Sequence, residues 1–98
     1  MKIIATTKEN ENVKREQFTP DLLKEETRTV WELYKQRIIR DIYFRADRKD
    51  AVIIMECGDV DEAKKFLDTL PLVREKLISF DIIPLRPYDG FEILFEQK

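Results

Sequence analysis

Residues Ala51 to Cys57 read Ala-Val-Ile-Ile-Met-Glu-Cys, a run that is apolar at nearly every position. A strand with one face in water alternates apolar and polar side chains, whereas a continuous apolar run indicates a strand covered on both faces. The run follows Ile38 to Arg45 and a polar connection, Ala46 to Asp50, so the two segments are predicted to form a β-hairpin. Helices can cover one face of the resulting sheet, and a partner sheet can cover the other.

Two amphipathic helices are predicted on either side of this hairpin. Thr19-Pro20-Asp21 supplies an N-cap, a proline at the first helical position and an acid in the first turn, which predicts a helix from about Pro20 to Arg37. Apolar residues recur at helical spacing again from Val60 to Leu70, up to Pro71. The buried stripe predicted for the first helix comprises Leu22, Leu23, Thr27, Val30, Trp31, Leu33 and Tyr34.

Three further segments are predicted strands: Lys2 to Thr7, Ile78 to Leu85 and the short Phe91 to Phe95. Pro84 confines its strand to a sheet edge or a strand end. The order β-α-β-β-α-β is the ferredoxin-like split β-α-β pattern, an α+β fold with both helices on one face of an antiparallel sheet, here with a short C-terminal strand added. We expect one domain over residues 1–98, because the chain contains no repeat, linker or low-complexity segment.

Composition excludes several classes of function. The net charge is −2, so the basic field that drives nucleic-acid binding is missing and nucleic acid is not an expected partner. No apolar run approaches the roughly 20 residues that span a bilayer, and the N-terminus lacks the apolar region of a signal peptide, so we expect a cytoplasmic protein with no membrane partner. Cys57 is the single cysteine, which fits a reducing compartment and leaves no intramolecular disulfide.

The chain contains no histidine. Serine-histidine-aspartate triads, cysteine-histidine dyads and histidine-ligated metals are therefore all excluded. Any acid-base chemistry falls to carboxylates, Tyr, Lys or Cys, and we expect no metal site.

Two stretches resemble the muconolactone isomerase-like family of small dimeric α+β-barrel proteins. They are Lys24-Glu25-Glu26-Thr27-Arg28-Thr29-Val30-Trp31-Glu32-Leu33, and Leu70-Pro71-Leu72-Val73 leading to Phe80-Asp81-Ile82-Ile83-Pro84-Leu85. The resemblance covers roughly residues 1 to 88. It implies a barrel of two sheets packed face to face in a homo-oligomer, a dimer or larger, with a ligand pocket between sheet and helices. It also implies proton transfer on an unsaturated lactone without metal or organic cofactor.

Such chemistry needs an acid-base group beside the activated C–H and a donor near the carbonyl. Glu26, in the motif on the first helix, is the predicted base; the alternative is a solvated helix acid that favours the macrodipole and pairs with a neighbour such as Arg28 or Lys24. Arg40 and Arg45 are the predicted anion-binding residues, because a guanidinium is planar and permanently charged. Structural ion pairs with Asp41 or Asp81 are the alternative.

Aromatic side chains complete the predicted binding site. Trp31 and Tyr34 on the first helix and Tyr43 on the second strand are large enough to contact a ring-shaped ligand, although core packing is the commoner use of such residues. Residues 86–91 include a proline and a glycine that fix a turn, and they either close a pocket or cross to a partner subunit.

Three functions remain open from the sequence. The first is a cofactor-independent isomerase-like protein that binds a small organic acid or lactone. The second is a non-catalytic homo-oligomeric binding or assembly module, and the third is a cofactor-free monooxygenase-like protein. Cavity size separates them: a small polar cavity indicates the first, a filled interior the second and a large aromatic cavity the third.

Overall fold

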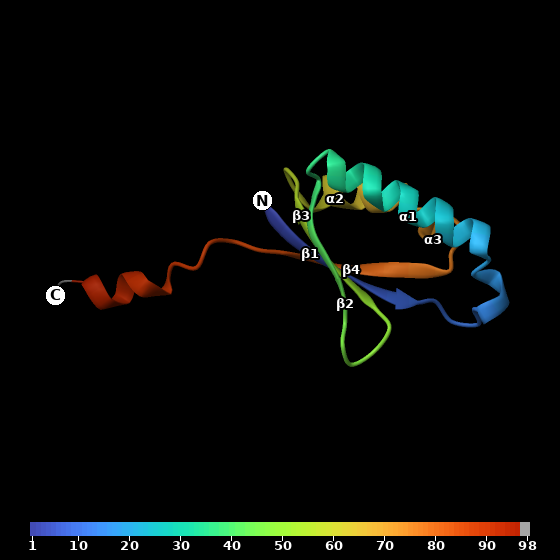
Figure 1. The fold of residues 1–98 in the computed structure, drawn as a ribbon. Coiled ribbons are helices and arrows are strands. Elements are labelled where there is room, and N and C mark those ends of the chain that lie inside the picture. The colour runs from blue at the N-terminus through green and yellow to red at the C-terminus, as the bar shows by residue number, and fades with distance from the viewer. Residues whose placement is uncertain (97–98) are drawn as a thin grey trace.

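A single antiparallel sheet of four strands organises the chain in the computed structural model, which describes residues 1–96. The strand order is β2-β3-β1-β4, so β2 and β4 form the two edges (Figure 1). The strands are β1 (Lys2–Glu9), β2 (Ile39–Phe44), β3 (Ala51–Glu56) and β4 (Ile78–Pro84). Pro84 is the last residue of an edge strand, as its missing amide proton requires.

The helices α1 (Pro20–Lys35), α2 (Val60–Leu67) and α3 (Pro71–Arg74) lie on one face of the sheet (Figure 1). Thr19 Oγ1 accepts from the Leu22 amide at 3.2 Å and caps α1, and Asp59 Oδ1 accepts from the Glu62 amide at 2.8 Å and caps α2. The predicted ferredoxin-like α+β fold is confirmed.

The predicted helix from Val60 to Leu70 is shorter in the structure. It ends at Leu67, and a separate helix, α3, begins at Pro71. Leu70, the residue before the proline, is extended, with φ −69° and ψ 130°. Proline disfavours the helical conformation of the preceding residue but fits the first position of a new helix, so Pro71 starts a helix as well as limiting one.

The core lies between the sheet and the helices. From the sheet, Ile3, Ala5, Ile53 and Met55 are almost fully buried. The helical layer contributes Leu33, Ala63, Leu67 and Leu70. Cys57 is buried beside them, and burial raises the pKa of its thiol, with the Glu62 carboxylate adding to the effect.

The face of α1 that packs on the core differs from the predicted stripe. Leu22, Glu26, Val30 and Leu33 are buried or half-buried, as is Thr29. The predicted core residues Leu23, Trp31 and Tyr34 are instead 42%, 55% and 45% exposed. The prediction was right for Leu22, Val30 and Leu33 and wrong for the others, because the apolar residues of α1 extend beyond the arc that one sheet and α3 can cover.

The opposite face of the sheet is apolar at its centre. Ile4 of β1 lies between Ile54 of β3 and Ile83 of β4, and Thr6 pairs with Val52. Neighbours across an antiparallel ladder point to the same side, and these residues alternate with the buried ones. No element of residues 1–96 covers this surface, which we call the open sheet face (Figure 1).

The C-terminal segment corrects a prediction. Residues Phe91 to Phe95, expected to form a strand, lie in a 3₁₀ helix, η2 (Gly90–Phe95). Beyond Pro84 the chain extends away from the sheet as a C-terminal arm, residues 85–96 (Figure 1). The arm raises the radius of gyration to 16.5 Å, against about 13 Å for a compact chain of this length.

A second short 3₁₀ helix, η1 (Arg15–Gln17), lies in the predicted loop between β1 and α1. Within residues 1–96, no helix has both the length and the apolar character needed to cross a membrane.

Candidate functional site

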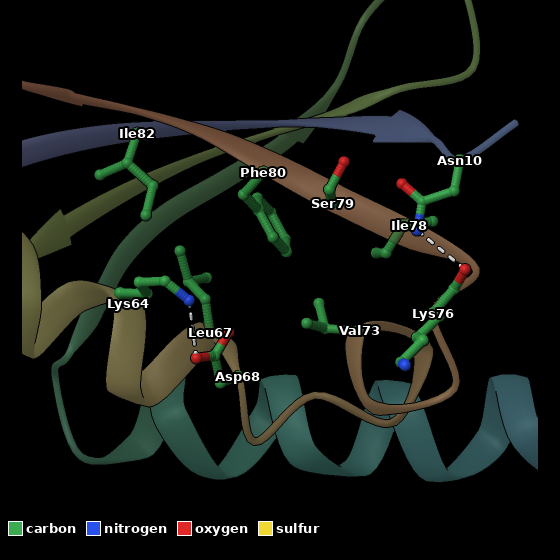
Figure 2. A pocket seen from close by; sticks show the side chains of 10 residues that line it. All are labelled: Asn10, Lys64, Leu67, Asp68, Val73, Lys76, Ile78, Ser79, Phe80 and Ile82. Atoms are coloured by element: carbon green, nitrogen blue, oxygen red, sulfur yellow. Dashed lines mark hydrogen bonds and ion pairs between the residues drawn. The ribbon is translucent and has the colours of Figure 1, made fainter.

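A cavity of about 280 Å³ lies between β4 and the short helices α2 and α3 (Figure 2). We call it the α2–β4 cavity. Its wall on the sheet side is built from β4, and its other wall from the facing sides of α2 and α3. The lining residues are Asn10, Lys64, Leu67, Asp68, Val73, Lys76, Ile78, Ser79, Phe80 and Ile82.

The interior of the cavity is apolar. Phe80 and Ile82 project from β4 toward Leu67 and Val73 of the helices (Figure 2). Phe80 and Ile82 share this face because strand residues two apart point to the same side. Leu67 and Ile78 are almost fully buried, so the cavity is a recess in the edge of the core itself. A ring or a short hydrocarbon would be desolvated by these walls.

Charged and polar groups surround the mouth. Lys64 and Asp68, one turn apart on α2, form an ion pair with Nζ and Oδ2 3.0 Å apart, and both side chains are more than half exposed. Lys76 follows α3, and its carbonyl accepts a hydrogen bond from Asn10 Nδ2 at 2.8 Å (Figure 2). Two ammonium groups and one carboxylate therefore give the mouth a net positive charge, which favours a small anion.

The position of Lys76 follows from the end of α3. Lys76 has a φ of 60°, and its amide donates to the Val73 carbonyl at 3.0 Å while the Leu77 amide donates to the Leu72 carbonyl at 3.0 Å. These two bonds form a Schellman motif, the compact ending that reverses the chain after a helix. The motif directs the chain into β4 and holds Lys76 at the cavity.

A second hollow, of about 300 Å³, lies at the opposite edge of the fold and is more open. We call it the α1–β2 groove; it is lined by Thr27, Val30, Trp31, Tyr34, Asp41 and Ile42. The Trp31 and Tyr34 rings stack with their centroids 5.8 Å apart and their planes inclined by 25°. Both aromatic residues predicted to contact a ligand on α1 therefore line this groove.

Glu26, the predicted base, lies on the side of α1 that faces α3. Its Oε1 accepts a hydrogen bond of 3.0 Å from the Leu72 amide in the first turn of α3, and it lines neither the cavity nor the groove. Burial raises the pKa of the Glu26 carboxyl, whereas the Leu72 amide and the charge of Arg74 act to lower it. The carboxylate caps a neighbouring helix, a role that neither sequence alternative anticipated.

The two predicted anion-binding arginines, Arg40 and Arg45, each bind a residue close to them in the sequence. Arg40 Nε donates to the Arg37 carbonyl at 2.6 Å, and Arg40 is the extra residue of a bulge between Ile39 and Asp41. Arg45 binds Asp47 through two hydrogen bonds, of 2.8 and 2.5 Å, and this contact lowers the pKa of the Asp47 carboxyl. The ion-pair alternative holds for Arg45, but with Asp47 as its partner.

Tyr43, the last predicted ligand contact, is 60% exposed and pairs with Val52, which places it on the open sheet face. The six predicted site residues are thus distributed over the α1–α3 contact, the α1–β2 groove, the two ends of β2 and the open sheet face, and they do not converge on one site. Among residues 1–96, no cluster of three or more Cys, Asp and Glu side chains is placed to hold a metal ion.

The residues that line the α2–β4 cavity were missed in the sequence. Lys64 and Asp68 are four apart on a helix, which is the spacing of an ordinary solvated ion pair. Ser79 alternates with Ile78 and Phe80 on β4, so its side chain points away from the helices (Figure 2). Nothing local in the sequence brings Asn10 to Lys76, since the two are 66 positions apart.

The strand order, the helical layer on one face and the open sheet face together define the ferredoxin-like half of an α+β barrel. The same fold occurs in the solved structure of 5-chloro-2-hydroxyhydroquinone dehydrochlorinase from Burkholderia phenoliruptrix AC1100, in complex with 2,5-dihydroxybenzoquinone. The two chains have a TM-score of 0.67 and 15% sequence identity, over 92% of this chain and 98% of the dehydrochlorinase chain. No protein-family model matches the sequence, and no curated protein matches it.

Proposed function

We propose that this protein binds a small organic acid or lactone in the α2–β4 cavity. The observation that carries the proposal is the combination of an apolar recess with Lys64 and Lys76 at its mouth. The walls can desolvate the carbon skeleton of such a ligand while an ammonium group meets its carboxylate or carbonyl oxygen. A cavity of about 280 Å³ is at the small end of the ligand sites of proteins, which reach roughly 1,000 Å³.

The structural neighbour supports a small oxygen-bearing ligand. That protein is named as a dehydrochlorinase of a hydroxyhydroquinone, and its structure contains 2,5-dihydroxybenzoquinone. The fold thus accommodates a six-membered ring carrying several oxygens. The cavity is small and contains one aromatic residue, Phe80, so it is not the large aromatic cavity expected of the monooxygenase-like protein; its polar groups lie at the mouth and not in the interior, so only its size matches the organic-acid expectation.

The chemistry proposed for the bound ligand is a cofactor-independent isomerisation. A base removes a proton from a C–H beside the carbonyl, and the proton returns at the other end of the shifted double bond. Glu26 is the base predicted from the sequence, and burial raises its pKa, but its carboxylate is bound to the Leu72 amide outside the α2–β4 cavity, so it can act on the ligand only after leaving that contact. Asp68 is a second carboxylate and lies at the cavity. Turnover lost in Glu26→Gln but kept in Asp68→Asn would assign the base to Glu26, and the reverse result would assign it to Asp68.

The proposal includes a homo-oligomer in which two open sheet faces pack together. Ile4, Ile54 and Ile83 form an apolar centre on that face. Burying them against the same surface of a second copy would remove apolar area from water and complete a barrel. The same observation supports the second candidate function, a non-catalytic assembly module, in which the sheet-to-sheet contact is the function and the cavity is incidental.

Ligand binding can be tested by titrating the ¹⁵N-labelled protein with benzoate and following amide chemical shifts. Benzyl alcohol, which has the ring but no charge, serves as the ligand control. We expect benzoate to bind more tightly than benzyl alcohol, and Lys76→Met to weaken benzoate by about tenfold, because one charged contact contributes roughly 1.4 kcal/mol. Lys49→Met, in the exposed β2–β3 turn, is the matched control and should leave the affinity unchanged.

The binding proposal fails if benzoate and benzyl alcohol shift no resonance of β4, α2 or α3. It also fails if Lys76→Met and Lys49→Met behave alike. The assembly function would then be favoured.

A further inference from the structure

The α1–β2 groove carries an aromatic and aliphatic surface that the chain leaves in water. Trp31 and Tyr34 are stacked along it, and Ile42 of β2 forms its other side. Leu23, at 42% exposed, continues the same line of α1 toward the N-terminus. Burial of large aromatic side chains contributes much of the free energy of protein interfaces, so this groove has the composition of a docking surface.

The C-terminal arm carries a second apolar surface. Tyr88, Phe91, Ile93, Leu94 and Phe95 are between 68% and 79% exposed. The Tyr88 and Phe91 rings meet edge to face with centroids 4.9 Å apart, which gives the arm a local structure of its own. Five large apolar side chains on one short segment would contact water unless the arm were covered.

The course of the arm points to a second copy as its partner. The Leu85 amide donates to the Lys2 carbonyl at 2.9 Å, and beyond this bond the chain leaves the sheet (Figure 1). The arm continues from β4, whereas the groove lies at β2, the opposite edge of the four-stranded sheet. The molecule is 63 Å long against 28 and 22 Å in its other dimensions, because the arm extends outward and does not fold back over the groove.

Charge complementarity supports the same pairing. The arm contains the carboxylates Asp89, Glu92 and Glu96. On α1, the side chains next to the Trp31 row are exposed and basic: they are Lys24, Arg28 and Lys35, of which Lys35 pairs with Glu32 at 2.9 Å, so Lys24 and Arg28 carry the complementary charge. Opposite charges beside an apolar contact would orient the arm along the helix and speed its docking.

We propose that the C-terminal arm of one chain docks in the α1–β2 groove of a second copy. Phe91 and Leu94 would contact Trp31 and Tyr34, and the arm's carboxylates would face Lys24 and Arg28. Exchange of arms between two copies is reciprocal, so each chain contributes one arm and one groove and the contact closes on itself. This proposal does not depend on ligand binding in the α2–β4 cavity.

Paramagnetic relaxation in a mixed sample tests the proposal. ¹⁵N-labelled wild-type chain is mixed with a second chain that has no ¹⁵N and carries a nitroxide at Glu96→Cys. This second chain also carries Cys57→Ala, so that the nitroxide attaches only at position 96. We expect the Trp31 indole resonance of the ¹⁵N chain to broaden, because the docked arm brings the nitroxide close to Trp31. The nitroxide is on the other molecule, so this broadening reports a contact between two chains. Trp31 is the single tryptophan, so its indole signal is unambiguous.

A matched variant keeps the test interpretable. Phe91→Ser combined with Leu94→Ser changes only exposed side chains of the arm, so the fold should remain intact. We expect this variant to lose the broadening and to raise the dissociation constant of the dimer at least tenfold. Ile93→Ser, outside the proposed pair of anchors, should have a smaller effect.

Two outcomes would overturn the proposal. In a second sample, the nitroxide and ¹⁵N are on the same chain, diluted with unlabelled protein. Broadening that occurs only in this second sample would mean that the arm folds back onto its own groove. Broadening in neither sample would mean that the arm docks elsewhere or remains in solvent. If benzoate does not bind but the broadening in the mixed sample is observed, the proposed function is refuted and the arm-docking proposal still stands.

Discussion

Glu26 shows how one side chain can combine a chemical property with a structural contact. Its carboxylate is half-buried between α1 and α3 and accepts from the Leu72 amide, one of the otherwise unsatisfied donors in the first turn of α3. A helix of four residues has little stability of its own, so a carboxylate at its N-terminus contributes directly to holding it in place. We expect Glu26→Ala to lower the free energy of unfolding by about 1–2 kcal/mol, measured by urea denaturation.

The pH dependence of stability gives a second test of Glu26. Burial raises the pKa of its carboxyl in the folded state above the usual value of 4.5, so the folded protein holds this proton more tightly than the unfolded chain does. Stability therefore falls as pH rises from about 4.5 through the folded-state pKa, and the loss is complete above it.

Glu26→Gln keeps an oxygen for the Leu72 amide and removes the titration. We expect the difference in unfolding free energy between Glu26→Gln and wild type to grow over this pH range, in favour of the glutamine. The exposed neighbour provides the control, because Glu25→Gln should follow the wild-type slope. Parallel curves for wild type and Glu26→Gln would contradict a buried, shifted carboxyl.

At the scale of elements, the end of α1 carries conformational strain. Arg37 has a φ of 65°, in the left-handed region that favours glycine. The Arg37 and Ile38 amides donate to the Tyr34 and Leu33 carbonyls, at 3.0 and 3.1 Å, and form a Schellman motif. We expect Arg37→Gly to raise the free energy of unfolding by roughly 0.5–1 kcal/mol, since the left-handed conformation costs a side-chain-bearing residue about that much.

Gln36 is the matched control for this prediction. It precedes Arg37 and has an ordinary helical φ of −79°. Glycine at this position gains no relief from strain and adds flexibility to the unfolded chain, so Gln36→Gly should lower stability by up to about 1 kcal/mol. Equal effects of the two glycines in thermal or urea unfolding would contradict the strain at Arg37.

Elements were the scale at which the sequence was most informative. Hydrophobic periodicity and the Thr19-Pro20-Asp21 start located α1 and the strands of the sheet, because those signals are local. The bulge at Arg40 was not predicted, and it interrupts the alternation from which the face of that arginine had been inferred. The apolar pattern of Phe91 to Phe95 indicated a strand, but this segment lies in the arm, which extends away from the sheet, and forms a 3₁₀ helix (Figure 1).

The candidate site was less predictable than the fold. Its lining comes from the β1–η1 connection, α2, α3 and β4, and only the tertiary structure brings these segments together. Trp31 and Tyr34 of α1 were predicted to contact a ligand, with core packing as the alternative, and their position on an open groove depends on how wide an arc of the helix the sheet covers. Residue type alone therefore could not separate a core stripe from an interaction surface.

At the scale of the whole molecule, the exposed apolar surfaces predict a dimer. The open sheet face and the C-terminal arm are two apolar surfaces on a chain of 11.8 kDa. Sedimentation equilibrium should give a mass close to twice that value. Ile54→Lys places a charge at the centre of the open sheet face and should shift the mass toward that of the single chain. Lys65→Ala changes an exposed residue of α2, on the helical side of the sheet away from the open sheet face, and should leave the dimer intact.

The position of a bound ligand decides which of the two hollows is the binding site. Nuclear Overhauser effects between the ring protons of benzoate and protein side chains identify which hollow is occupied. We predict contacts with Phe80, Val73 and Ile82, which line the α2–β4 cavity. Contacts with Trp31 and Tyr34 instead would place the ligand in the α1–β2 groove and contradict the proposed site.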